Sequence, residues 1–266
     1  MDAIVVTLAV VLGLVIGSFA NVPIHRWPRG GTVTSPKRSA CPSCEAPIAP
    51  RDNVPVVSWL ALRGSCRHCG EPIAVRYAIV EASMALIFGL IAWRRGVDPL
   101  LPALLVFAWA LVVATAIDLE HRIIPNRLTY RLPLVLLPLL VLAAALGGSW
   151  DDLRRATIWA IGVPGIMFAV AELFRLLRGK MGMGMGDVKL AISIGLVVGY
   201  LGGIHLAVFA YATMATSLVV VVVLLLARRA RLASRIPFGP YLAAGALVPV
   251  LAPDAGADLV RSLLGL

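Results

Sequence analysis

Charged side chains are scarce in this sequence. Asp, Glu, Lys and Arg make up 14% of the 266 residues, hydrophobic residues make up 60%, and the mean hydropathy is +0.91. A soluble globular domain carries about 25% charged residues, so this composition excludes that class. We expect no cleavable leader either, because the chain begins Met-Asp and lacks the basic residues that precede the apolar core of a signal peptide.

Long apolar runs are abundant, and each approaches the length of about 20 residues that a membrane-spanning helix needs. We predict an all-α polytopic membrane protein with about eight transmembrane helices. The predicted spans are 3–22, 77–93, 99–117, 132–147, 156–174, 190–205, 207–227 and 237–252. We divide the chain into a first helix (1–22), an extramembrane domain (23–76), a seven-helix membrane domain (77–252) and a tail (253–266) along the outer surface.

The basic residues are distributed unevenly. If the N-terminus lies outside, nineteen of the 24 Lys and Arg residues fall in the four segments on the cytoplasmic side, which are 23–76, 118–131, 175–189 and 228–235. This bias is typical of the positive-inside rule, so the net charge of +10 reports topology and not nucleic-acid binding. The arginines of 228–235 suit anionic lipid headgroups.

All four cysteines lie in the predicted extramembrane domain. Cys41 and Cys44 form one C-x-x-C pair, and Cys66 and Cys69 form another. Two such pairs present four sulfurs to one ion and predict a structural zinc site. Unligated or redox-active thiols remain the alternative, whereas disulfides are disfavoured in the reducing cytoplasm. We expect His68 to be a loop residue and not a fifth ligand.

Two aspartates stand at predicted span ends on the same side of the membrane. Asp118 follows the third span, and Asp187 precedes the sixth. Paired carboxylates can share one proton, so that one activates water and the other protonates a peptide carbonyl. This pattern predicts an aspartyl protease dyad, although a helix-end charge is the simpler interpretation of either residue alone. Glu120 and His121 are an alternative acid–base pair.

Residues around Asp187 support the same interpretation. Gly182, Gly184 and Gly186 carry no side chain, so a substrate backbone could approach closely and the loop could adopt positive φ. Lys189 could hold the Asp187 carboxylate ionised, or its side chain could simply extend to the membrane interface. Glu81 is a further candidate for the site.

Six stretches of the chain, taken together, resemble the type IV prepilin peptidases. They are GSFANVPIHRWP (17–28), the cysteine domain (41–69), IAVRYAIVEA (73–82), Asp118 followed by Ile124-Pro125, the GxGD motif at 184–187 with Lys189, and IPFGPYLAAG (236–245). Asn126 departs from the acidic residue that often follows Ile-Pro in that family, and the departure leaves the assignment of Asp118 intact.

The resemblance implies a substrate and a second reaction. Prepilins or pseudopilins would lose a basic leader after a glycine at the cytoplasmic boundary, and S-adenosylmethionine would methylate the new N-terminus. The implied catalytic residues are Asp118 and Asp187, and the implied location is the bacterial inner membrane. We expect membrane lipids as partners and no nucleic acid.

Two other classes of protein remain as alternatives. A proton- or cation-coupled transporter could use paired carboxylates, but such sites lie near the bilayer midplane and between repeats. No repeat recurs at a fixed period here. A membrane scaffold with a zinc-ribbon docking domain would leave the glycine-flanked Asp187 unexplained.

Overall fold

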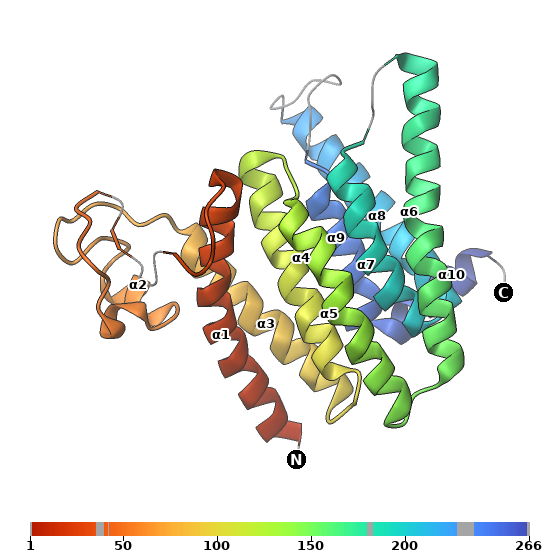
Figure 1. Ribbon diagram of the computed structural model, residues 1–266, viewed down its shortest axis with the longest axis horizontal. Helices are drawn as coiled ribbons and strands as arrows, with labels where there is room; N and C mark the ends of the chain where they lie inside the picture. The colour runs from red at the N-terminus through yellow and green to blue at the C-terminus, as the bar shows by residue number, and fades with distance from the viewer. Residues whose placement is uncertain (1, 36–39, 42, 180–182, 228–236, 265–266) are drawn as a thin grey trace. The chain divides into compact units, whose positions relative to one another are not determined.

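The chain divides into two compact units, Met1–Val97 and Asp98–Leu266. The computed structural model describes residues 2–35, 40–41, 43–179, 183–227 and 237–264 (Figure 1). Within these residues the regular structure is helical, with two isolated β-bridges and no strand. The predicted all-α class is therefore confirmed.

Unit 1 contains two long helices, α1 (Asp2–Arg26) and α3 (Arg76–Arg95), that pack side by side. Glycines bring their backbones together. A Cβ on Gly13 would lie 2.7 Å from the Cα of Ala85, and a Cβ on Gly17 would lie 2.8 Å from the Cα of Glu81. Small residues have this role in bilayers, where lipid is as apolar as leucine and close packing drives association.

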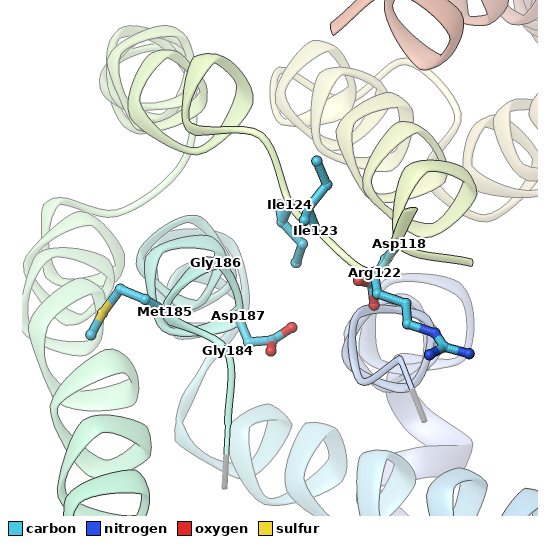
Figure 2. Close-up of a pocket in the computed structure, with 8 residues that line it drawn as sticks. All are labelled: Asp118, Arg122, Ile123, Ile124, Gly184, Met185, Gly186 and Asp187. Carbon is cyan, nitrogen blue, oxygen red and sulfur yellow. The ribbon is translucent and has the colours of Figure 1, made fainter. Parts of the chain in front are cut away.

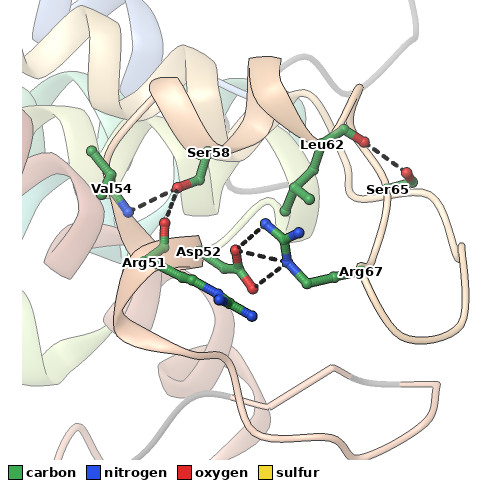
Figure 3. Close-up of polar contacts among 7 residues, drawn as sticks. All are labelled: Arg51, Asp52, Val54, Ser58, Leu62, Ser65 and Arg67. Atoms are coloured by element: carbon green, nitrogen blue, oxygen red, sulfur yellow. Dashed lines mark hydrogen bonds and ion pairs between the residues drawn. The ribbon is translucent and has the colours of Figure 1, made fainter.

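The segment between these helices is largely irregular, with the short helices η1 (Trp27–Arg29), η2 (Pro50–Asn53) and α2 (Val57–Ala61). A bidentate ion pair joins Arg67 to Asp52 of η2, with an Nη2–Oδ1 distance of 2.7 Å (Figure 3). The guanidinium holds the pKa of Asp52 below its ordinary value. The pair therefore fastens η2 to the loop that carries the second cysteine pair.

Two hydroxyl groups add to this small structure. Ser58 accepts the backbone N–H of Val54 at 3.0 Å and donates to the carbonyl of Arg51 at 3.0 Å. Ser65 donates to the carbonyl of Leu62 at 2.7 Å (Figure 3). These bonds satisfy backbone groups that no regular helix or sheet would pair.

Unit 2 is a helical bundle. Its elements are α4 (Leu101–His121), α5 (Asn126–Ala145), α6 (Trp150–Arg178), α7 (Met185–Leu201), α8 (Gly203–Leu226), α9 (Gly239–Leu251) and α10 (Pro253–Leu264). Helix α7 packs against α4, α5, α6, α8 and α9, and twelve of its 17 residues are buried. A helix that is apolar on all sides is expected at such a central position.

Each predicted span overlaps a helix, and span 190–205 also covers the start of α8 at Gly203, but the helices are not equally long. Six helices of the described chain are long and apolar enough to cross a membrane, or seven if α9 and α10, bent by 104°, count as one span. Helices α7 and α9 have only 17 and 13 residues. The protein is a multi-pass membrane protein, and the predicted count of about eight spans was loose.

The helix ends near the aspartates also differ from the prediction. Asp118 lies inside α4, which continues to His121, and Asp187 lies in the first turn of α7. Helix α5 begins at Asn126, six residues before the predicted start at 132, because polar residues form its first turns. Segment 228–235 lies outside the described residues.

Candidate active site

Asp118 and Asp187 line one pocket of about 230 Å³. Residues from the end of α4, the α4–α5 connection and the start of α7 complete it, namely Arg122, Ile123, Ile124, Gly184, Met185 and Gly186. In Figure 2 the Asp187 carboxylate points across the pocket toward the side on which Asp118 lies. Asp118 and Asp187 are only 5% and 7% exposed. The pocket thus combines two buried acids, the arrangement needed to share a proton.

The Asp118 side chain is fixed from the far end of the sequence. The backbone N–H of Gly239, the first residue of α9, donates to its Oδ2 at 2.9 Å. The carbonyl of Asp118 accepts the N–H of Arg122, which closes α4 in a left-handed conformation (φ 55°). Side chain and backbone of Asp118 are therefore both held.

The pocket glycines matter because they have no Cβ. A Cβ on Gly184 would lie 3.0 Å from Oδ2 of Asp187, and a Cβ on Gly186 would lie 3.0 Å from the Cβ of Ile124. The expected positive φ is wrong for Gly184, which has φ −72° as the N-cap of α7, and Gly186 is helical. Gly182 lies outside the described residues. The glycines matter here because they admit close neighbours.

Lys189 does not bond to Asp187. Its Nζ donates to Oδ1 of Asn126 at 2.8 Å and lies 4.9 Å from the ring centre of Tyr130. The lysine therefore joins α7, two residues after Asp187, to the first turn of α5. Asn126, the departure from the family pattern, is its partner.

The other candidate acids lie elsewhere. Glu120 is exposed and pairs with His121 at 3.8 Å, and neither residue is among those lining the pocket. Glu81 belongs to unit 1, where its Oε2 accepts the N–H of Val56 at 2.6 Å. Val56 has φ 61°, a strained conformation for a β-branched residue, so Glu81 stabilises the start of α2.

A second cluster, in unit 1, consists of the four cysteines. Their Sγ atoms all lie within 4.8 Å of one another, with 3.8 Å between Cys41 and Cys69 and 4.0 Å between Cys44 and Cys66. A tetrahedral ion with Zn–S bonds of about 2.3 Å separates its sulfurs by about 3.8 Å. The sulfur positions therefore fit a metal ion, and His68 is not part of the cluster.

Each cysteine pair sits in its own backbone turn, and the two turns have the same hydrogen-bonding pattern. The N–H of Cys41 donates to the carbonyl of Ala46, and the N–H of Cys66 donates to that of Glu71. An antiparallel bridge encloses each pair, Ala40 with Pro47 and Ser65 with Pro72. The residue after each pair, Glu45 or Gly70, has positive φ. The two turns are thus local copies that face one another.

The pKa values of two of the thiols are shifted in opposite directions. Backbone N–H groups of Cys44 and Ser43 lower the pKa of Cys41 to about 6. For Cys69 the N–H of Glu71 favours the thiolate, but burial and hydrogen bonds to the other three sulfurs raise the pKa to about 12. A bound cation would remove this obstacle, because coordination deprotonates thiols.

Comparisons with known proteins cover both units. Residues 11–95 match the Bacterial Peptidase A24 N-terminal domain, and residues 105–228 match the Type IV leader peptidase family. A Prepilin leader peptidase/N-methyltransferase of Stutzerimonas stutzeri is 35% identical over 272 residues, covering 92% of this chain and 90% of that protein. The chain belongs to the type IV leader peptidase family.

Other relatives with the same name agree with this leader peptidase over most of its length. The Neisseria gonorrhoeae protein is 33% identical, covering 94% of this chain and 91% of that protein. The protein of Burkholderia pseudomallei strain 1026b is 37% identical, covering 89% and 82%. No solved structure matches. Membership of a peptidase family favours the enzyme over the transporter and scaffold alternatives.

Two features of the leader peptidase pocket escaped the sequence analysis. Gly239 lies within the IPFGPYLAAG stretch, whose resemblance to the family gave no hint of a contact with Asp118. Ile123 and Ile124 line the pocket because α4 ends sharply at Arg122. The Ile-Pro pair after Asp118 was the available signal, because a residue before proline is disfavoured in a helix.

Proposed function

We propose that this protein is a membrane aspartyl endopeptidase that removes the basic leader from type IV prepilins or pseudopilins, with Asp118 and Asp187 as its catalytic pair. The observation that carries the proposal is the single pocket that both carboxylates line. Family membership supplies the substrate class, because relatives over nearly the whole chain are named prepilin leader peptidase/N-methyltransferase.

The chemistry follows from two acids that share one proton. The ionised carboxylate takes a proton from water, the resulting hydroxide attacks the scissile carbonyl, and the protonated carboxylate gives its proton to the carbonyl oxygen. The tetrahedral intermediate then expels the amine, which receives the proton taken from water, and a hydroxyl of the intermediate returns a proton to the second carboxylate as the carbonyl reforms. Gly184 and Gly186 leave room for the substrate backbone beside Asp187. Cleavage after a glycine of the leader suits this narrow approach.

The test is cleavage of a prepilin by the detergent-purified protein and by Asp118→Asn and Asp187→Asn. Each substitution keeps the side-chain volume and removes the acid, so we expect the rate to fall by about 10² to 10⁴-fold. Glu120→Gln is the matched control, because it removes an exposed acid two residues from Asp118. Variants that fold and still cleave would place the chemistry elsewhere.

The protein also carries, in our proposal, a structural zinc ion on Cys41, Cys44, Cys66 and Cys69. A four-thiolate site has no open position, so the ion would hold the loops of domain 23–76 together and take no part in catalysis. We expect about one zinc per purified chain and almost none after Cys41→Ser with Cys66→Ser. If the cysteine loops of the parent protein resist protease equally well with and without the metal, this role is contradicted.

N-methylation of the new N-terminus by S-adenosylmethionine comes to this chain from the name of its relatives. Asn21 has a buried Oδ1 that accepts no hydrogen bond among the described residues, so it could contact a bound cofactor. A single acceptor does not make a cofactor site. We therefore assign no residue to the methyl donor and derive no step through it.

The proposal includes an arrangement in the bacterial inner membrane. The N-terminus would lie outside, and the domain 23–76 and both aspartates would lie on the cytoplasmic side, where the basic leader of a prepilin is found. Helix 1–22 would precede that domain, the peptidase domain would extend over 77–252, and the tail 253–266 would follow outside. Nineteen basic residues on the cytoplasmic segments support this orientation.

A further inference from the structure

Helix α9 contacts Asp118 through a direct backbone hydrogen bond. The N–H of Gly239 donates to Oδ2 at 2.9 Å, and this is the hydrogen bond found for that carboxylate among the described residues. Gly239 begins α9, where backbone N–H groups have no partner within the helix. Pro240 follows and has no N–H, so the Gly239 N–H is the donor that this helix end can direct at the acid.

Only glycine allows this approach. A Cβ at residue 239 would lie 2.9 Å from Oδ2, 3.2 Å from Cγ and 3.3 Å from Cβ of Asp118. Any larger residue would push the carboxylate or α9 away. Gly239 has no positive φ to explain its presence, so the close contact with Asp118 is the physical reason for a glycine here.

We propose that Gly239 is a positioning residue that orients Asp118 and makes it the unprotonated member of the pair; this inference rests on the proposed function. A hydrogen bond from an N–H stabilises the ionised carboxylate over the protonated acid, so the bond from Gly239 favours placing the shared proton on Asp187. Two cations lie nearby: Lys189 is bonded to Asn126, and Arg122 lines the pocket, but among the described residues neither forms an ion pair with Asp118.

The inference gives each aspartate one role. Asp118, with Oδ2 held by α9, uses Oδ1 to take a proton from the attacking water. Asp187, which receives no bond from α9, carries the shared proton and gives it to the carbonyl oxygen of the substrate. When the C–N bond breaks, the proton on Asp118 passes to the leaving amine. A hydroxyl of the intermediate returns its proton to Asp187 as the carbonyl reforms, so both acids return to their starting states.

Two variants test this arrangement. Gly239→Ala keeps the N–H and adds the obstructing methyl group, whereas glycolate in place of Gly239 turns the 238–239 amide into an ester, which removes the N–H and adds no bulk. We expect each to lower kcat for prepilin cleavage about tenfold or more, with KM within about twofold. Gly165→Ala on α6, whose added Cβ would meet no atom within 4 Å, should match the parent.

The outcomes separate the two proposals. A parent that cleaves no prepilin would overturn the proposed function and this inference with it. A parent that cleaves, with an ester variant that keeps the parental kcat or changes KM alone, would overturn the inference and leave the proposed function standing. If Gly239→Ala does not fold in detergent, the ester variant decides the question, because it introduces no steric conflict.

Discussion

Gly186 illustrates how little space the pocket leaves at the scale of one residue. A methyl group there would meet the Cβ and carbonyl oxygen of Ile124 at 3.0 and 3.3 Å. Both atoms belong to or adjoin the backbone of the α4–α5 connection. Such atoms move aside less easily than the end of a flexible side chain. The helix itself would accept alanine well, so any effect must come from this contact.

We therefore expect Gly186→Ala to lower kcat/KM for prepilin cleavage about tenfold without reducing thermal stability, because α7 and Asp187 would move away from Ile124. The assay is cleavage by purified protein, with unfolding followed in the same detergent. Gly203→Ala on α8 is the control, since its Cβ would meet nothing within 4 Å. Equal activities of the two variants would show that the pocket adapts.

Lys189 gives a second prediction, because its contacts with Asn126 and Tyr130 connect α7 to α5. We expect Lys189→Met and Asn126→Ala each to lower the cleavage rate about three- to tenfold, since both remove the same hydrogen bond near Asp187. Asn126→Asp should retain the parental rate, because a carboxylate also accepts from the lysine. An effect of Lys189→Met alone would mean that the lysine acts directly on Asp187.

The sequence pointed to both aspartates of the pocket but not to their contacts. Asp118 and Asp187 were predicted together, and the structure places both in one pocket. The partners of Lys189 and the donor to Asp118 were not predictable, because they lie 63 and 121 residues away. Sequence spacing constrains neighbours on one helix, whereas such distant pairs depend on how helices pack.

At the scale of helices, α1 and α3 show how an apolar run can encode a contact. Gly13 and Gly17 are four residues apart on α1, so both lie on the face that meets α3. Other large apolar side chains of α1, such as Ile4, Leu8 and Val15, are exposed. Hydropathy alone predicts that α1 spans the membrane, but the glycine spacing identifies the face that packs.

We expect Gly17→Leu to lower the unfolding temperature in detergent by about 5 °C or more, because the leucine would separate the backbones of α1 and α3. Leu12→Ile changes an exposed position of the same helix and should have little effect. Unfolding followed by circular dichroism provides the comparison. Identical melting of the two variants would mean that α1 contributes little to the stability of unit 1.

Helix lengths show where sequence patterns were insufficient. Runs of apolar residues located every helix of unit 2 from α4 to α9, because a bilayer demands them. They misjudged the ends, since polar first turns such as that of α5 carry no hydropathy signal. The boundaries of α7 and α9 depend on Gly184 and Gly239, whose roles appear only once their neighbours are known.

At the scale of the whole molecule, orientation in the membrane can be tested directly. Alkaline phosphatase is active only outside the cytoplasm. We expect fusions after Val97 and Gly147 to be active and fusions after Leu62 and Arg122 to be inactive, in line with the basic residues near the latter. Active fusions at Leu62 would reverse the proposed topology and place the cysteines in an oxidising compartment.

The shortness of α7 and α9 has a consequence for the lipid around the protein. At 1.5 Å per residue these helices measure about 26 and 20 Å, less than the hydrocarbon thickness of about 30 Å. Asp187 lies in the first turn of α7, and the donor to Asp118 is the first residue of α9. We therefore expect the bilayer to thin locally so that these helix ends reach water. The acyl-chain length of the surrounding phospholipid should therefore affect the rate of cleavage. Reconstitution in phosphatidylcholines of increasing acyl length should slow cleavage once the bilayer is too stiff and thick to deform around unit 2.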